Sequence, residues 1–413
     1  MNLIKKFIAL ILACSLFSIT ALADMAELPQ QSTPVTEYYS DDMLSNFDDD
    51  SIQTSVSSAT LESLPAKAMI LMEQSTGAVL FESHADEQLA PASITKIMSL
   101  LLFCEAISDG KLKLSDKITC SEHASSMGGS QIWFEPGETM TVDDLMKAVA
   151  VGSANDATVA LAEAVSGSEE AFVDLMNSRA KELGMKNTHF VNCSGLDAEG
   201  HLTTARDIAI MSRELMKHSL ITNYSTIWMD TLRNGSTQLV NTNKLVRFYN
   251  GATGLKTGTT DQAGCCLSAT AKRDSLELIA VVMGSASSND RFSSAKALLN
   301  FGFANYTTTK VQIDISENDS IKINGGTKTN IKLTAQKNVN VLSEKTNADK
   351  IKVKFNLPES IDAPVKKGDV IGRAEVLLDD NLITTVNIKA TEDVEVMTFM
   401  KALLRVLMGI FDN

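Results

Sequence analysis

The sequence predicts an α+β fold, in which an antiparallel sheet is flanked by helices and is followed by a small all-β domain. Two short apolar segments, at 68–72 and 78–81, are separated by a polar turn and are typical of a β-hairpin. Further along the chain, the apolar runs 264–271 and 276–283 enclose the polar residues 272–275 and indicate two adjacent antiparallel strands. Helical patterns occupy much of the chain between these two pairs.

The expected helices are marked by capping residues and by apolar residues on one face. The segment that begins at Ser93 continues as an apolar run and ends at the C-capping signal Asp109-Gly110. Another helix opens at Thr141, a capping residue that is followed by acids in the first turn. It ends before Ser153 and Asn155, which we therefore place at a junction between two helices. Further helices are expected at 157–165, 168–183, 204–218 and 293–301.

Beyond about residue 310 the apolar pattern changes to a period of two, with Asn, Gly and Asp turns between the segments. This alternation is typical of strands with one solvated face. The clearest segments are 311–315, 331–333, 351–355 and 385–388. We therefore expect a main domain at 64–308 and a small β-rich domain at 309–392.

The last segment, 393–413, is expected to form an amphipathic helix. Its apolar residues share one helical stripe: Met397, Met400, Leu403, Leu404, Leu407, Met408 and Phe411. The stripe is too short to span a bilayer but suits a helix that lies in a membrane interface. The alternative is a helix that docks on the β domain.

The N-terminus has the pattern of a secretory signal peptide. Lys5 and Lys6 precede a largely apolar run, and the small residues at 21–23 offer a cleavage site, so we expect a signal peptide at 1–23. Cys14 raises the alternative of a lipoprotein site. The following segment, 24–63, is polar and acidic and is expected to be a disordered leader.

Composition excludes several classes of protein. The net charge is −14 and the pI is about 4.9, which argues against nucleic acid as a partner. Five cysteines remain after the signal peptide, two of them adjacent, and neither they nor the scattered histidines have the spacing of a disulfide framework or a metal site. We therefore expect no metal and no cofactor.

A serine and a lysine three residues apart form the first chemical motif. On a helix Ser93 and Lys96 share a face, and a partly desolvated lysine can act as the base for a serine hydroxyl. The pattern alone is weak, because it also occurs at Ser108/Lys111, Ser178/Lys181 and Ser293/Lys296.

Two further motifs follow in order. Ser153-Ala-Asn155 lies at the expected helix junction, and Lys256-Thr257-Gly258 precedes the strand at 264–271. Lys256 supplies a cation and Thr257 a hydroxyl, which together suit a substrate carboxylate. Gly258 would let a substrate backbone approach closely. Each motif is weak alone, but their order is much more specific.

In these motifs and their order, the chain resembles the low-molecular-mass penicillin-binding proteins, specifically the exported serine D-alanyl-D-alanine carboxypeptidases. The resemblance runs from about residue 64 to the C-terminus and implies the fold of the serine β-lactamases and transpeptidases. It also covers the segments 91–93, 135–138, 141–145, 153–157, 187–190, 201–207, 254–258 and 291–302.

The resemblance implies an acyl-enzyme mechanism. Ser93 would attack the carbonyl of the penultimate D-alanine, and Lys96 would take its proton, which requires a pKa lowered by burial and nearby cations. Ser153 would relay that proton toward the leaving amine, while the Asn155 amide would hold the substrate's peptide group. Water would then hydrolyse the acyl-enzyme.

The same resemblance implies a set of substrate-binding residues. Lys256 would keep the site electropositive, with Thr257 at the terminal carboxylate. Arg291 matches the family's carboxylate-binding arginine, whose guanidinium fork suits that task; the alternative is a surface ion pair. The backbone N–H groups of Ser93 and Thr259 would form an oxyanion hole.

The implied partners are peptidoglycan stem peptides that end in D-Ala-D-Ala, β-lactam antibiotics as covalent inhibitors, and a membrane surface through the C-terminal helix. The implied location is the outer face of the cytoplasmic membrane. Alternatives that remain open are a D,D-endopeptidase or weak transpeptidase, a β-lactamase, and a non-catalytic peptidoglycan-binding protein.

The sequence departs from the family pattern in two places. Thr259 stands where some relatives carry histidine, and Cys265-Cys266 stands where relatives often have an aromatic residue. Because only the backbone of Thr259 is given a role, the main chemistry is unaffected. We interpret His201 as a structural residue.

Overall fold

The computed structural model describes residues 58–403. Its central feature is a five-stranded antiparallel sheet, with the strands in the order β2 (Val79–Ser83), β1 (Ala68–Glu73), β9 (Leu276–Ser285), β8 (Gly264–Arg273) and β7 (Ala252–Thr260). The hairpin β1–β2 and the pair β8–β9 are the two strand pairs predicted from the sequence, and both are confirmed. Strand β1 pairs with β9, with Ile70 opposite Val281. The two distant parts of the chain therefore join in the middle of one sheet.

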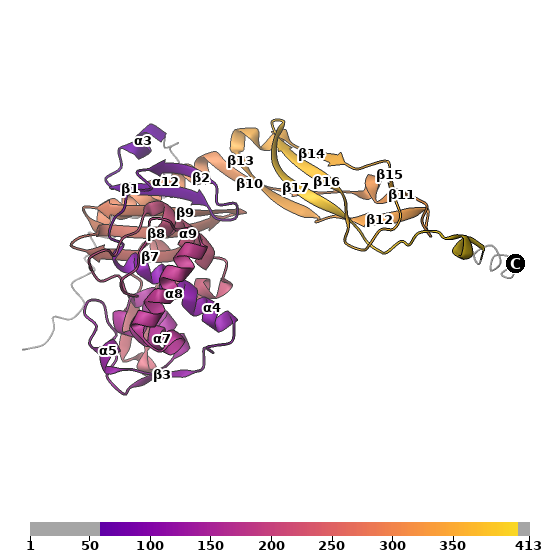
Figure 1. Cartoon of the computed structure of the whole chain (residues 1–413). Helices are drawn as coiled ribbons and strands as arrows, with labels where there is room; N and C mark the ends of the chain where they lie inside the picture. The colour runs from indigo at the N-terminus through magenta and orange to yellow at the C-terminus, as the bar shows by residue number, and fades with distance from the viewer. Residues whose placement is uncertain (1–57, 404–413) are drawn as a thin grey trace, which may run out of the picture. The chain divides into compact units, whose positions relative to one another are not determined.

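Helices cover the sheet, as Figure 1 shows for α12 (Ser288–Asn305) and for the group that contains α4, α7, α8 and α9. Strands β8 and β9 are buried along nearly their whole length, as expected for strands covered on both faces. Helix α12 packs on β8 and β9 and begins earlier than the predicted 293–301, because Ser287 caps it by accepting from Asp290 N. Arg291 consequently lies in the first turn of α12.

The remaining long helices follow the predicted pattern. Their bounds are α4 (Lys96–Ser108), α6 (Val142–Gly152), α7 (Asn155–Ser166), α8 (Glu169–Glu182) and α9 (Ala205–Leu215). A short 3₁₀ turn, η2 (Ala92–Thr95), precedes α4 and carries Ser93. Thr141 caps α6 as expected, and Ser153 ends this helix in the left-handed conformation, with φ 62°. The predicted helix–helix junction is therefore confirmed.

Short elements between the long ones were not predicted, because segments of three to five residues carry little periodicity. They are α3 (Ser58–Glu62), β3 (Lys117–Thr119), α5 (Glu122–Ser125), β4 (Thr139–Thr141), η3 (Ser219–Ile221), α10 (Thr222–Ser225), β5 (Met229–Leu232), η4 (Arg233–Gly235), β6 (Thr237–Val240) and α11 (Leu245–Phe248). Strands β3 and β4 pair with each other, as do β5 and β6.

The chain after α12 is almost entirely β structure. One sheet has the order β14 (Ile351–Asn356), β16 (Val370–Leu378), β17 (Asn381–Ala390), β12 (Asn330–Thr334), β11 (Ser320–Asn324) and β15 (Ser360–Asp362). A separate pair is formed by β10 (Tyr306–Gln312) and β13 (Asn338–Glu344). The four predicted segments all fall in or next to strands, which confirms the all-β character. Strand β10 spans the expected boundary at 308.

Several expectations for the termini fall outside the described residues. The signal peptide, most of the leader and residues 404–413 of the expected amphipathic helix belong to this group. The leader was expected to reach residue 63, but residues 58–62 form α3, in which Leu61 is fully buried. Residues 399–403 are helical. Within 58–403, no helix is both long enough and apolar enough to cross a membrane.

Candidate active site

Ser93 lies on a turn that two glycines approach closely. Its neighbour Ala92 has φ 48°, a left-handed conformation that residues with a side chain seldom adopt. A Cβ on Gly258 of β7 would lie 2.8 Å from Ser93 N, and a Cβ on Gly195 would lie 1.9 Å from Ala92 O. Both positions therefore require glycine. The turn that carries Ser93 fills the Cβ position of Gly258, and the expected approach of a substrate backbone to Gly258 stays a prediction.

Lys96 is fully buried, and its Nζ makes three polar contacts. The nitrogen lies 3.0 Å from Ser93 Oγ, 2.5 Å from Asn155 Oδ1 and 2.5 Å from the backbone oxygen of Ser194. Burial lowers the pKa of Lys96 to about 7, because the ammonium ion loses its hydration. The expected lowering of this pKa is thus present, and its leading cause is burial.

The three contacts determine how a neutral Lys96 amine would be oriented. Asn155 Oδ1 and Ser194 O can only accept, so they take the two hydrogens of a neutral amine. The remaining lone pair then has one neighbour with a proton to give, the Ser93 hydroxyl. This arrangement can withdraw a proton from Ser93 Oγ.

Asn155 connects Lys96 to a neighbouring loop. Its Nδ2 donates to Gly128 O at 2.6 Å, and its backbone N donates to Ser130 O at 2.7 Å. The side-chain oxygen of Asn155 is engaged by Lys96, and the expected contact of its amide with substrate stays a prediction. Ser153, two residues earlier, is buried at the C-terminal end of α6. Both residues of the second motif thus lie at the junction that approaches Lys96.

The third motif lies on β7, the edge strand next to η2. Lys256 is fully buried, and its Nζ donates to Thr257 O at 3.0 Å. Burial holds the pKa of Lys256 well below its usual value, and the charges of Lys96 and Arg291 add to this effect. The hydroxyl of Thr257 donates to Thr242 Oγ1 at 2.7 Å. The motif therefore places a desolvated lysine and a hydroxyl on the strand beside Ser93.

Arg291 reaches the same strand from α12. It is only 8% exposed, and its Nη1 donates to Thr259 Oγ1 at 2.9 Å and to Gly258 O at 3.1 Å. The alternative of a surface ion pair is therefore wrong. The Nε atom is buried and has no hydrogen-bond partner among the described residues. The guanidinium therefore lies against β7 at Thr259, beside the third motif.

Two residues outside the three motifs also contact the site. Ser194 contributes its backbone oxygen to Lys96, and His201 Nε2 lies 2.8 Å from Thr95 Oγ1 on the Ser93 turn. His201 Nδ1 accepts from Val191 N at 3.0 Å, so its Nε2 carries the hydrogen. Burial lowers the pKa of His201 to about 4. A neutral His201 that makes a hydrogen bond at each ring nitrogen supports the interpretation of this residue as structural.

The adjacent cysteines lie beside the third motif. Cys265 is opposite Thr259 across β7 and β8, with its Sγ 3.9 Å from Thr259 Oγ1. Cys265 and Cys266 are both buried free thiols. Nothing in the structure gives the pair a chemical role. No group of metal-ligating side chains occurs among residues 58–403.

Comparison with protein families agrees with this geometry. Residues 53–287 match the family model described as D-alanyl-D-alanine carboxypeptidase, which covers more than half of the chain. The chain belongs to the D-alanyl-D-alanine carboxypeptidase family. Residues 306–396 match a second model, the C-terminal domain of penicillin-binding protein 5. The predicted family and fold class are therefore confirmed.

Individual relatives cover most of the chain. The D-alanyl-D-alanine carboxypeptidase DacF of Bacillus subtilis is 42% identical over 83% of this chain and 89% of its own length. DacC of Escherichia coli is 36% identical over 81% of this chain and 85% of its own length. The crystal structure of penicillin-binding protein 5 from Haemophilus influenzae is 31% identical, with a TM-score of 0.70 over 81% of this chain and 98% of that one.

Proposed function

We propose that this member of the family removes the terminal D-alanine from peptidoglycan pentapeptide stems through an acyl-enzyme on Ser93. The observation that carries the proposal is the contact between Lys96 Nζ and Ser93 Oγ, in which the other two neighbours of Nζ are acceptors. A pKa of about 7 leaves much of Lys96 neutral under physiological conditions. Lys96 is therefore a base that lies within hydrogen-bond distance of the nucleophile Ser93.

In the first half-reaction, Ser93 Oγ bonds to the carbonyl carbon of the penultimate D-alanine, and its proton passes to Lys96 Nζ. The amide C–N bond then breaks, and Ser153 relays the proton to the departing D-alanine amine. In the second half-reaction, water attacks the ester carbon and returns the proton to Ser93 Oγ through Lys96. The products are D-alanine and a tetrapeptide stem, and the enzyme is regenerated.

The substrate's charges are matched by the groups on β7 and α12. The backbone N–H groups of Ser93 and Thr259 form the oxyanion hole, and the close approach of Gly258 to Ser93 N supports this pairing. The terminal carboxylate is held by Arg291 with Thr257 and Thr259, near Lys256. A bound carboxylate would favour the charged form of Lys256 and so offset the lowering of its pKa by burial. Asn155 fixes Lys96 and holds the substrate's peptide group with its remaining amide hydrogen.

The same site would bind β-lactams covalently. The structure of penicillin-binding protein D2 from Listeria monocytogenes in its ampicillin-bound form is 31% identical, with a TM-score of 0.54 over 58% of this chain and 98% of that one. A β-lactam carbonyl would acylate Ser93 in place of the peptide carbonyl.

The enzyme is exported and attaches to the outer face of the cytoplasmic membrane. Residues 1–23 are the signal peptide and 24–57 the leader, and the catalytic and β-rich domains precede the membrane-associating segment 393–413. Three apolar side chains at the start of this segment, Phe399, Met400 and Leu403, are exposed, which supports a helix that meets a membrane surface.

The test is labelling with a fluorescent penicillin followed by assay on a pentapeptide that ends in D-Ala-D-Ala. Wild-type protein should be labelled and should release D-alanine, and Ser93→Ala should do neither. Ser108→Ala is the matched control, since Ser108 also has a lysine three residues later but lies exposed at the end of α4. Undiminished labelling of Ser93→Ala would overturn the mechanism. Rapid loss of the label without D-alanine release would favour a β-lactamase.

A further inference from the structure

Trp133 is largely exposed to solvent and has a strained backbone conformation. Its side chain is 76% exposed, and its φ is 55°, in the left-handed region that bulky residues rarely adopt. Backbone strain of this kind persists only where the surrounding contacts enforce it, and such positions cluster at functional sites. Packing does not explain an exposed indole that is held in a strained conformation.

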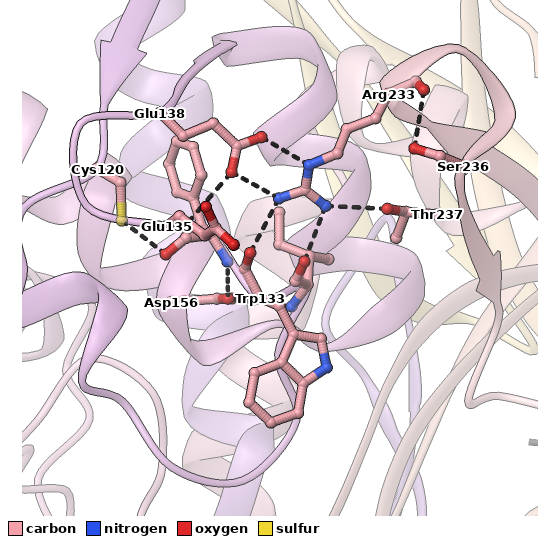
Figure 2. Close-up of polar contacts among 10 residues, drawn as sticks. Cys120, Trp133, Glu135, Glu138, Asp156, Arg233, Ser236 and Thr237 are labelled. Atoms are coloured by element: carbon pink, nitrogen blue, oxygen red, sulfur yellow. Dashed lines mark hydrogen bonds and ion pairs between the residues drawn. The ribbon is translucent and has the colours of Figure 1, made fainter. Parts of the chain in front are cut away.

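The backbone on both sides of Trp133 is fixed by two charged side chains (Figure 2). Ile132 N and Phe134 N donate to Asp156 Oδ2 at 3.1 and 3.0 Å, and Asp156 is fully buried. Arg233 donates from Nη1 to Ile132 O at 2.8 Å and from Nη2 to Trp133 O at 3.2 Å. These contacts hold the residue that presents the indole to solvent.

Arg233 is itself held in place. Its φ is 51°, also in the left-handed region, and its guanidinium forms a two-point ion pair with Glu138 at 2.6 and 2.9 Å. Arg233 also lines a cleft of about 550 Å³ whose walls are mostly polar. Polar residues of the cleft include Lys117, Thr139, Thr141, Thr231 and Asn234. Trp133 and this cleft thus share one supporting residue.

The loop that carries Trp133 is bonded directly to the candidate active site. Ser130 O and Gly128 O, at the start of this loop, both accept from Asn155, whose side-chain oxygen binds Lys96. Asp156, the next residue along, anchors Trp133 from both sides. A ligand on the indole would therefore be placed by the same helix end that orients Lys96.

We propose that Trp133 and the cleft lined by Arg233 bind the glycan strand of peptidoglycan, with the C–H face of a sugar ring against the indole. This proposal rests on the proposed function, because it assigns a second part of the same substrate. An indole combines an apolar face with a polar N–H, and the hydroxyls of the neighbouring sugar can both donate to and accept from the mixed polar lining of the cleft.

The surroundings disfavour other occupants. A docking protein or a lipid tail would require a contiguous apolar patch, whereas the cleft that Arg233 lines has mostly polar walls. An anionic membrane surface would require excess positive charge, whereas Glu135 and Glu138 lie within a few residues of the indole along the chain. A neutral sugar ring requires neither a contiguous apolar patch nor an excess of positive charge.

The binding test uses a neutral tetrasaccharide of β-1,4-linked N-acetylglucosamine, because N-acetylmuramic acid without its peptide carries a free carboxylate. Trp133 and Trp228 are the two tryptophans of the chain, so Trp228→Phe leaves Trp133 as the reporter; the ring contact of Trp228 with Phe248 tolerates a phenyl ring. The tetrasaccharide should change the emission of Trp133 in a saturable way. Calorimetry should show at least about tenfold weaker binding for Trp133→Asn and a smaller loss for Trp133→Phe. Asparagine tolerates the left-handed conformation, so this variant should remain folded.

Penicillin labelling of the same proteins separates the two proposals. Labelling of wild type without any tetrasaccharide binding would overturn the glycan site and leave the proposed function intact. Equal tetrasaccharide affinity for Trp133→Asn and wild type would also overturn it. Binding that depends on Trp133 in a protein that penicillin does not label would support the glycan site and contradict the proposed function. As a further readout, the ratio of kcat/KM for a disaccharide-linked pentapeptide to that for the free pentapeptide should fall in Trp133→Asn.

Discussion

Gly258 on β7 lies so close to Ser93 that a Cβ at position 258 would stand 2.8 Å from Ser93 N. The same Cβ would lie 2.9 Å from Ala92 Cβ and 3.0 Å from Ile94 N. The strand that carries Lys256 and the turn that carries Ser93 are therefore in direct backbone contact. This contact fixes the separation between the two N–H groups of the proposed oxyanion hole.

Gly258→Ala should slow acylation of Ser93 by about 10²-fold, because the added methyl group displaces an oxyanion donor. The measurement is the second-order rate of labelling by a fluorescent penicillin. Gly184→Ala is the control, because Gly184 has φ 78° but no atom near its Cβ position. The control should lower thermal stability without slowing acylation. An acylation rate for Gly258→Ala equal to that of wild type would contradict the proposed oxyanion hole.

The pH dependence of acylation should follow Lys96. Because burial lowers the pKa of Lys96 to about 7, the neutral amine becomes available as the pH rises through this value. The acylation rate should therefore increase with pH around neutrality and then level off. Lys96→Arg keeps a cation that does not lose its proton, and it should reduce the rate by about 10²–10⁴-fold. A wild-type profile that is flat across neutral pH would argue against Lys96 as the base.

His201 should make folding stability depend on pH. Its pKa is about 4 in the folded protein against 6.5 for an ordinary histidine, so the unfolded chain binds the proton more tightly. Stability should consequently fall as the pH drops from 6.5 toward 4. The loss between neutral pH and pH 5 should be about 2 kcal/mol.

Urea unfolding at several pH values measures this effect. The pH dependence across this window should be smaller in His201→Asn, which lacks the titrating group. The variant should also be less stable at neutral pH, because the contacts with Thr95 and Val191 are lost. An unchanged pH dependence in His201→Asn would assign the effect to another group.

The sequence predicts the part of the site that depends on side-chain chemistry. Ser93, Lys96 and Asn155 lie in short motifs whose order is informative, and the structure brings them together at Lys96 Nζ. Arg291 could be assigned only through the family resemblance, because its helix begins earlier than the apolar pattern indicates.

Contacts made by backbone atoms across long separations could not be predicted in this way. Ser194 O reaches Lys96 from 98 residues away, and any residue type at position 194 would supply the same oxygen. His201 forms a hydrogen bond with Thr95, which is 106 residues away in the sequence. The chain has five histidines, and the sequence does not indicate which residue any of them contacts. The strained φ of Trp133 is likewise a property of the tertiary contacts around it. Side-chain motifs thus indicate the reaction, while the positioning groups become visible only in the fold.

The C-terminal segment should control membrane attachment. Phe399, Met400 and Leu403 are 80%, 61% and 42% exposed, and a surface helix gains free energy when such side chains enter the interface. Deleting residues 397–413, or changing Phe399 and Met400 together to Asp, should release the protein from phospholipid vesicles in a flotation assay. Penicillin labelling should be retained.

Leu382→Asp supplies the matched control for this prediction. Leu382 is 57% exposed on β17, so the change removes a similar apolar surface from outside the C-terminal segment. It should leave vesicle binding unaltered if the terminal helix is the attachment site. Equal loss of binding in Leu382→Asp would indicate that general surface hydrophobicity is responsible. Full binding after the deletion would instead show that the attachment lies elsewhere in the chain.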